Sequence, residues 1–179
     1  MKKSTALVFG LICGLLVIVF KLIIVLGGFA ITNFGFKWSQ IISVLLVLPF
    51  IWLAIRQSRI QNGGFIGGKE ALRTGLQTAI LAILIISVYH YIELEWKWKD
   101  IAAVYYNSET FLNILKSHAD LKQEQYAKII NDQIQNIQTL SPFKYVTFKM
   151  VPFLLFSVTT AFMCAVFMKK SPPPSYTNN

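Results

Sequence analysis

The residues best spaced for recognisable chemistry lie in one glycine-rich stretch, Gly63-Gly64-Phe65-Ile66-Gly67-Gly68-Lys69-Glu70. It nearly matches the phosphate-binding pattern G-x-x-x-x-G-K-[ST], in which backbone amides surround phosphate and the hydroxyl binds magnesium. Glu70 stands where that hydroxyl belongs, and a carboxylate there repels phosphate. The segment before the loop is an apolar helix rather than a core strand. We therefore expect a tight turn of residues that tolerate positive φ, and neither a nucleotide nor a nucleic-acid partner.

A second candidate for chemistry is the pair His90 and Glu93, which share one face of a continuing helix. Imidazole beside a carboxylate can bind a proton, or a metal when further ligands are present. Two ligands are too few to hold a metal, so we interpret Tyr89, His90 and Tyr91 as amphipathic side chains at a membrane surface. Cys13 and Cys164 lie in apolar runs, and we interpret them as small apolar residues that pack between the helices. We expect no catalytic residue, no cofactor and no resident metal.

Four apolar runs must position these residues, approximately at 5–26, 40–55, 72–91 and 146–168. Each is close to the roughly 20 residues that a helix needs to cross a bilayer. The composition agrees, with 55% hydrophobic residues and a mean hydropathy of +0.55. A bilayer cannot satisfy unpaired backbone groups, so these runs predict helices. The fold class is therefore all-α: an integral membrane four-helix domain with a helical segment between the third and fourth spans.

The distribution of charge predicts the orientation of these spans. Both ends of the chain and the loop between the second and third runs carry eight basic residues and one acid, namely Lys2, Lys3, Arg56, Arg59, Lys69, Arg73, Lys169, Lys170 and Glu70. The segment 93–144 carries six lysines and seven acidic residues. Basic residues favour the cytoplasmic side, so we expect both termini in the cytoplasm and the long segment outside.

Lys21 lies near the outer end of the first run, which we interpret as a retained span rather than a signal peptide. A lysine there can extend its ammonium to the interface, so we expect it to snorkel. The alternative is a buried charge paired with an acid of another span. The four predicted span cores contain no Asp or Glu, and this absence argues against ion-coupled transport.

The segment at about 100–140 has apolar residues at helical spacing, with a break near 117–121. Asp120, followed by Gln123, resembles the start of a helix, so we predict two helices joined by a turn. The second helix has a possible partner face of Tyr126, Ile130, Ile134 and Ile137. That face must be covered either by the protein itself, by the bilayer surface or by a partner.

Two rows of small residues at four-residue spacing predict close helix contacts inside the membrane. They are Ala6, Gly10 and Gly14 in the first run, and Ser157, Ala161 and Ala165 in the fourth. Such rows form either internal contacts or a dimer interface. An outer aromatic belt is expected from Trp38, Trp96, Trp98 and Tyr145. The proline-rich stretch 171–179 is expected to be a disordered cytoplasmic tail after a membrane domain at 1–170.

The glycine-rich loop also carries a family resemblance. Its residues Asn62, Gly63, Gly64, Phe65 and Ile66, followed by Lys69, Ala71, Leu72 and Gly75, resemble the inner loop of a family of short bacterial four-span proteins. This family, typical of Bacteroidota, is catalogued as domain of unknown function 4199. The Tyr-rich end of the third span and the Ser141-Pro142 turn extend the resemblance to nearly the whole chain. The family implies a fold and a membrane location, for which we expect the bacterial inner membrane, and it brings no activity or ligand.

Taken together, these patterns favour a non-enzymatic scaffold or interaction protein of the cell envelope. Its partners would be the lipid bilayer and either another envelope protein or a second copy, bound through the outer helices or the small-residue faces. The alternative is a small oligomeric channel or a transporter subunit.

Overall fold

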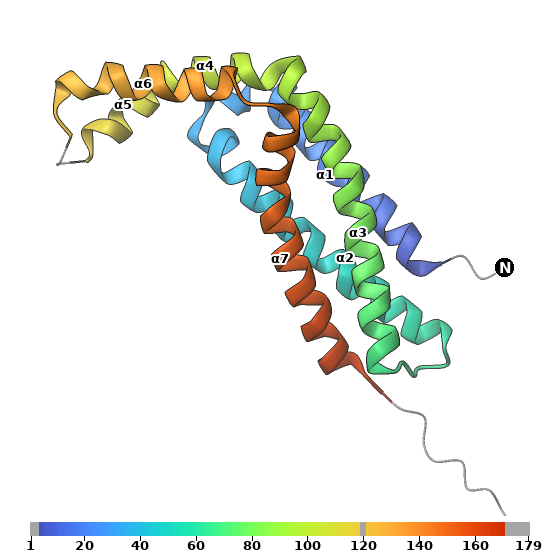
Figure 1. The fold of residues 1–179 in the computed structure, drawn as a ribbon. Helices are drawn as coiled ribbons and strands as arrows, with labels where there is room; N and C mark the ends of the chain where they lie inside the picture. Colours follow the sequence, from blue (N-terminus) through green and yellow to red (C-terminus); the bar gives the residue numbers. More distant parts are fainter. Residues whose placement is uncertain (1–3, 119–120, 171–179) are drawn as a thin grey trace, which may run out of the picture. The chain divides into compact units, whose positions relative to one another are not determined.

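A computed structural model of the chain describes residues 4–118 and 121–170, and within these it is helical without a named β-strand. The long helices are α1 (Thr5–Leu26), α2 (Ser39–Gln61), α3 (Gly68–Glu93) and α7 (Pro142–Met168). Figure 1 follows them along the chain together with the shorter helices α4 (Lys99–Tyr106), α5 (Glu109–Lys116) and α6 (Gln123–Gln138). The all-α prediction is confirmed, and in this described part of the chain four helices are long and apolar enough to cross a membrane. The positions of Lys2, Lys3, Asp120 and the tail 171–179 lie outside the described residues.

The long helices carry large apolar side chains on their exposed faces, which is the reverse of a water-soluble helix. Leu84, Val88 and Phe162 are each about 60% exposed, at 59%, 62% and 60%. Polar and small residues are instead buried in the interior, among them Ser43, Thr78 and Ala161. This distribution is favourable when lipid replaces water around the helices.

Three of the long helices, α2, α3 and α7, are longer than the apolar runs that predicted them, while α1 matches its run at 5–26. The second run at 40–55 is part of Ser39–Gln61, preceded by a π-helical segment at Phe34–Trp38. The third run at 72–91 is part of Gly68–Glu93, which continues through a second π-helical segment at Leu94–Trp98 into α4 (Lys99–Tyr106). Hydropathy marks only the apolar middle of a helix, because the polar residues at its ends are helical without contributing to the apolar run.

The chain folds into two compact units, which are described separately. Of the described residues, unit 1 comprises 4–17, 44–86 and 150–170, and unit 2 comprises 18–43, 87–118 and 121–149. Each long helix contributes residues to both units.

Small residues permit close helix packing in unit 1. A Cβ atom on Gly75 of α3 would lie 3.0 Å from Cβ of Ala161 on α7. A Cβ on Gly14 of α1 would lie 2.9 Å from Cβ of Ile85 on α3. Both predicted small-residue rows therefore make internal contacts in this unit.

Unit 2 contains an apolar core that includes Ile24, Val25, Leu94, Trp98 and Ile101. The rings of Phe36 and Tyr105 stack against each other with centroids 4.0 Å apart. The rings of Phe36 and Trp98 also stack, at 5.1 Å. These aromatic contacts pack the π-helical segment at Phe34–Trp38 against α4.

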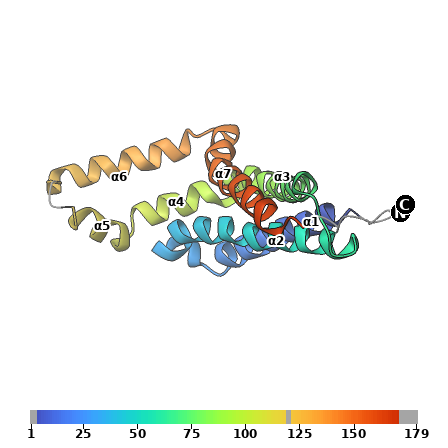
Figure 2. The ribbon, with the colours of Figure 1, turned by 90° about the horizontal axis from the view of Figure 1, so that it is seen from below.

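The segment between α3 and α7 holds three helices rather than the predicted two: α4, α5 (Glu109–Lys116) and α6 (Gln123–Gln138). In Figure 2, α6 runs back beside α4. The predicted break near 117–121 separates α5 from α6. The further break before α5 comes from Ser108, whose hydroxyl accepts a hydrogen bond from the Phe111 amide at 3.3 Å. A serine N-cap of this kind starts a new helix without glycine or proline.

Candidate functional site: a buried cluster of ionisable side chains

The last turn of α3 places three polar side chains in the interior of unit 2. His90 and Glu93 are 0% and 1% exposed, and Nδ1 of His90 lies 2.6 Å from Oε2 of Glu93. A carboxylate only accepts hydrogen bonds, so the ring nitrogen is the donor. The Tyr89 hydroxyl donates to the other oxygen, Oε1, at 3.2 Å. Residues three and four apart on a helix share one face, which is why both side chains reach Glu93.

A third donor to Glu93 comes from α7. The Tyr145 hydroxyl donates to Oε2 at 3.3 Å, and Tyr145 is itself buried. The Tyr145 ring also meets the His90 ring edge-on, with centroids 6.0 Å apart. The carboxylate thus accepts hydrogen bonds from three side chains, which is how a charged group is accommodated away from water.

Lys21 of α1 is also part of the interior, and its expected snorkelling is wrong. The side chain is only 2% exposed, and its Nζ donates to the Ser39 hydroxyl at 3.0 Å. That hydroxyl in turn donates to the carbonyl of Gly35, one turn earlier. Burial disfavours the charged form of this side chain, and two contacts oppose that cost: the Ser39 hydroxyl accepts its hydrogen bond and Glu93 attracts the ammonium electrostatically.

A second lysine, Lys149 of α7, lies at the edge of the same cluster. Its Nζ lies 4.9 Å from the ring centroid of Trp98 and 5.4 Å from that of Tyr145. Aromatic faces attract a cation at this distance. The backbone carbonyl of Lys149 accepts a hydrogen bond from Nε2 of Gln40 at 3.2 Å.

The aromatic belt is therefore only partly as expected. Trp38 and Trp96 are 53% and 47% exposed, as belt residues would be. Trp98 and Tyr145 are buried instead, because their rings pack beside Lys149 and the cluster. The belt interpretation of Tyr89 and His90 is also wrong, because both are buried with hydrogen bonds to Glu93, while Tyr91 is exposed.

The charges of the cluster do not cancel. Glu93 interacts electrostatically with both Lys21 and Lys149, so two lysines stand against one carboxylate and one imidazole. Groups this close gain and lose protons as a coupled set rather than one by one.

Nε2 of His90 is buried and has no hydrogen-bond partner among the described residues. In that part of the chain no group of three or more His, Cys, Asp or Glu side chains could hold a metal ion. The chemistry this arrangement offers is proton uptake and release.

The sequence predicts one shared helix face for His90 and Glu93, but a third span that ends at residue 91 assigns the pair to a surface belt. Glu93 lies two residues further along the same helix and is buried. A buried acid therefore exists in the interior, contrary to the expectation from the span cores. The available signal was the spacing of Tyr89, His90 and Glu93, which favours one shared helix face.

The residues of the family loop lie in unit 1 and form a turn. Gly63 and Gly64 have φ angles of 70° and 90°, and the Gly64 carbonyl accepts a hydrogen bond from Nε of Arg59 at 2.9 Å. Asn62 donates through Nδ2 to Oε1 of Glu70 at 2.7 Å, across the loop. The acid that breaks the phosphate-binding pattern thus holds the turn together.

The remaining loop residues have separate surroundings. The Phe65 ring lies 5.7 Å from Nζ of Lys170, and Lys69 is exposed in the first turn of α3. Gly75 lies deeper in α3, against Ile51, Ile55 and Ala161. The loop also exchanges two backbone hydrogen bonds with the segment after α7: Ile66 N to Lys170 O at 3.0 Å, and Lys170 N to Ile66 O at 2.9 Å.

The possible partner face of α6 lies in unit 2. Ile130 is buried, and Tyr126, Ile134 and Ile137 are half-buried. Helix α6 packs against α4 and α5, so part of this face is used within the unit.

The fold and the buried cluster define the class of the protein as an α-helical, multi-pass membrane protein. The chain belongs to the family described as "Protein of unknown function (DUF4199)", which it matches over residues 8–170. Searches of curated proteins and of solved structures found no match.

Proposed function

We propose that the protein is a non-enzymatic membrane protein that binds and releases protons at the cluster of Lys21, His90 and Glu93. In this proposal it is a proton-coupled transporter or a subunit of one. The observation that carries the proposal is the hydrogen-bonded pair of His90 and Glu93, buried within a helix long and apolar enough to cross a membrane.

The physical argument is the cost of ionisable groups away from water. A charged side chain among apolar helices is expensive, and such residues are typical of proton relays and ion pathways. A histidine beside a carboxylate can change its protonation near neutral pH. Lys21 from α1 and Tyr145 from α7 tie that change to two other helices, so a proton can alter the balance of helix contacts in unit 2.

A second candidate function is a scaffold or interaction protein of the cell envelope. It is favoured by α6, whose exposed face is rich in amide side chains, including Gln125, Asn131, Gln135 and Asn136. Uncharged amides suit a protein partner better than an anionic membrane surface. The partner would be another envelope protein or a second copy of this chain.

For location we propose the bacterial inner membrane, with both termini cytoplasmic and α4 to α6 outside. The support is the excess of basic residues at the chain ends and in the loop between α2 and α3, set against a near balance in 93–144.

The decisive experiment is a pH jump on proteoliposomes adsorbed to a solid-supported membrane. A proton that enters the cluster moves part of the way across the membrane dielectric, so wild-type protein should give a transient current. Sustained proton entry should follow with a membrane potential, read with a pH dye inside the vesicles. Glu93→Gln should abolish both signals.

Glu95→Gln is the matched control, since Glu95 is 54% exposed and pairs with Lys99 at 3.0 Å. It should leave the currents unchanged. If wild type and Glu93→Gln both give no current, the proton-coupled function is wrong and the interaction protein becomes the better conclusion.

A further inference from the structure

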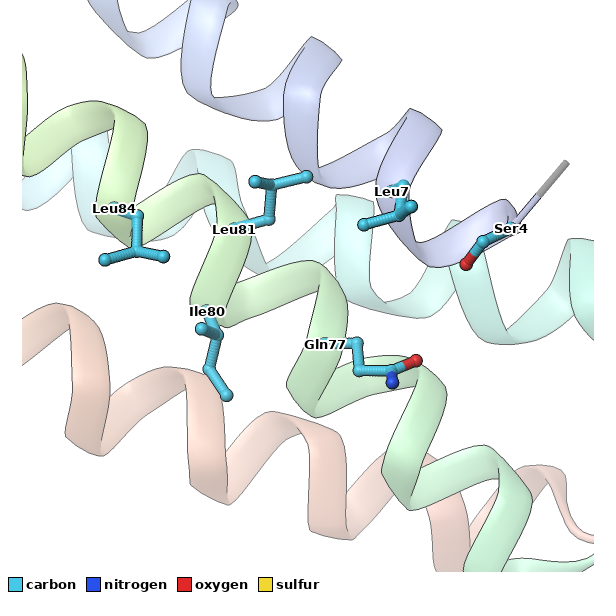
Figure 3. Close-up of a pocket in the computed structure, with 6 residues that line it drawn as sticks. All are labelled: Ser4, Leu7, Gln77, Ile80, Leu81 and Leu84. Carbon is cyan, nitrogen blue, oxygen red and sulfur yellow. The ribbon is translucent and has the colours of Figure 1, made fainter.

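Three adjoining hollows surround the first turns of α1 in unit 1. A groove of about 310 Å³ is lined by Ser4, Leu7, Gln77, Ile80, Leu81 and Leu84. Figure 3 shows Leu7 on α1 and Leu81 pointing toward that helix from α3. A second groove of about 270 Å³ is lined by Thr5, Val8, Phe9, Gln57 and Gln61.

Between the two grooves lies a pocket of about 170 Å³ with mostly polar walls. Its hydroxyl and amide groups belong to Ser4, Thr5, Ser58, Gln61, Thr74 and Gln77. It shares Ser4 and Gln77 with the first groove, and Thr5 and Gln61 with the second. A polar pocket is thus continuous with two largely apolar grooves, one between α1 and α3 and one between α1 and α2.

The exposed face of α3 shows the same change from charged to apolar. Arg73, Gln77, Leu81 and Leu84 follow one another at spacings of four, four and three, so they lie on one face. Arg73 and Gln77 are exposed. The ion pairs among the described residues are His90 with Glu93 and Lys99 with Glu95, so Arg73 has no carboxylate partner there.

This order of groups matches the order of groups in a phospholipid. Guanidinium groups bind phosphate through paired hydrogen bonds. Hydroxyls and amides suit the ester and glycerol oxygens that follow the phosphate, and the leucine-lined trough suits an acyl chain. Because α3 is a candidate span, the exposed amide of Gln77 also gains a polar partner that hydrocarbon cannot supply.

We propose that unit 1 binds one diacyl phospholipid that straddles α1. Its phosphate lies at Arg73, its ester region fills the pocket between Thr5, Thr74 and Gln77, and its two chains lie in the two grooves. This site is independent of the proton cluster, since every residue it uses belongs to unit 1.

A groove in unit 2 provides an internal comparison. It has a similar volume of about 300 Å³ and is lined by Ser87, Val88, Tyr91, Ile92, Phe143 and Val146. As in the unit 1 grooves, no cationic residue lines it, but its lining also lacks an amide side chain like that of Gln77, which follows the exposed Arg73 by one turn on α3.

Native mass spectrometry of the full chain in mild detergent tests the proposal. The protein is incubated with phosphatidylglycerol, with a diacyl glycolipid of equal chains and an uncharged head, or with single-chain lysophosphatidylglycerol. We expect one retained phosphatidylglycerol, with at least about tenfold weaker retention of the glycolipid, because a charge-assisted hydrogen bond is lost. The single-chain lipid should also bind more weakly, since it fills one groove.

Two variants and one control locate the site. Arg73→Gln should weaken phosphatidylglycerol retention by about tenfold or more, and Leu84→Trp should exclude a chain from the first groove. Both positions are exposed, so the fold should tolerate the changes. Val88→Trp fills the comparison groove and should change nothing. The proposal is overturned if the glycolipid or the single-chain lipid is retained as well as phosphatidylglycerol. It is also overturned if Arg73→Gln and Leu84→Trp leave phosphatidylglycerol retention unchanged.

Discussion

Lys21 and Glu93 belong to different long helices, yet both are buried in unit 2 and attract each other electrostatically. A lysine and a glutamate separated by 71 intervening residues are thereby brought into one interior. Their electrostatic attraction makes the cluster a tertiary feature rather than a local one, and the first two predictions follow from it.

Replacing Lys21 by methionine should lower the free energy of unfolding by about 1.5–3 kcal/mol, the range for a hydrogen bond to a charged group. The change removes the donor to Ser39 and a counter-charge of Glu93. Titration of the purified protein with a denaturing detergent measures the loss. Lys37→Met is the control, because Lys37 is exposed. Wild-type stability in Lys21→Met would mean that the ammonium reaches the interface after all.

Replacing Glu93 by alanine should be more costly, at roughly 3–5 kcal/mol, because it leaves buried donors and charges without their acceptor. The hydroxyls of Tyr89 and Tyr145 and Nδ1 of His90 all lose a partner. Glu95→Ala removes an exposed ion pair and should cost at most about 1 kcal/mol. The same unfolding titration compares them, and equal costs for the two variants would argue against a buried network.

The third prediction concerns orientation. Single cysteines at Asn62 and Gln125, in a background without Cys13 and Cys164, should be labelled from opposite sides of the membrane. Both positions are exposed, so accessibility to reagent depends on the compartment. A membrane-impermeant maleimide applied to intact cells should react at position 125 and leave position 62 unmodified. Labelling at position 62 in intact cells would reverse the assignment.

The fourth prediction concerns α6. Changing Ile130 and Ile134 to aspartate puts two charges on the face that packs against α4 and α5, at a cost of several kcal/mol where the face is buried. Limited proteolysis of the purified protein should then cut within 107–140, while the long helices still insert.

Asn131→Asp with Gln135→Asp adds the same two charges to the exposed face and should keep the wild-type proteolysis pattern. If the isoleucine variant is also protected when purified but loses a partner in native membranes, the face docks another protein. A variant unchanged in both assays would show that the face contributes nothing.

The fifth prediction concerns the contact of α3 with α7. Gly75→Val should destabilise unit 1 by about 1–3 kcal/mol, because the new side chain must displace Ile51, Ile55 or Ala161. Gly67→Ala is the control, since a Cβ there meets nothing within 4 Å. Thermal unfolding in detergent should separate the two, and an equal melting temperature for Gly75→Val would show that the helices can part without cost.

The four long helices could be predicted from the apolar runs because hydropathy and length are local properties. Close helix contacts at Gly10, Gly14 and Ala161 could also be predicted, since small residues at four-residue spacing permit close approach, but the sequence left open whether the contact is internal or with a second copy. What the sequence could not supply was the direction of each polar side chain. A lysine near a helix end is compatible with the interface and with the interior, and only the position of Ser39 and Glu93 decides.

The two helix starts after α4 differ in how well the sequence predicts them. The Ser108 cap was visible in principle, but the apolar pattern continues past it, so the break between α4 and α5 was not predicted. The break before Gln123 was predicted because the apolar pattern itself stops there. A break between helices can thus be predicted where the apolar spacing stops. It is not predicted where an N-cap separates two helices with the same apolar spacing.

The paired backbone hydrogen bonds between Ile66 and Lys170 bear on the order in which the protein is made. A ribosome adds roughly 5–20 residues each second, so Lys170 follows Ile66 by roughly 5–20 s. During that interval the loop has emerged but its backbone partner does not yet exist. The glycine-rich loop is therefore among the last parts of unit 1 to be completed, and until then its backbone groups stay open to water or to the insertion machinery.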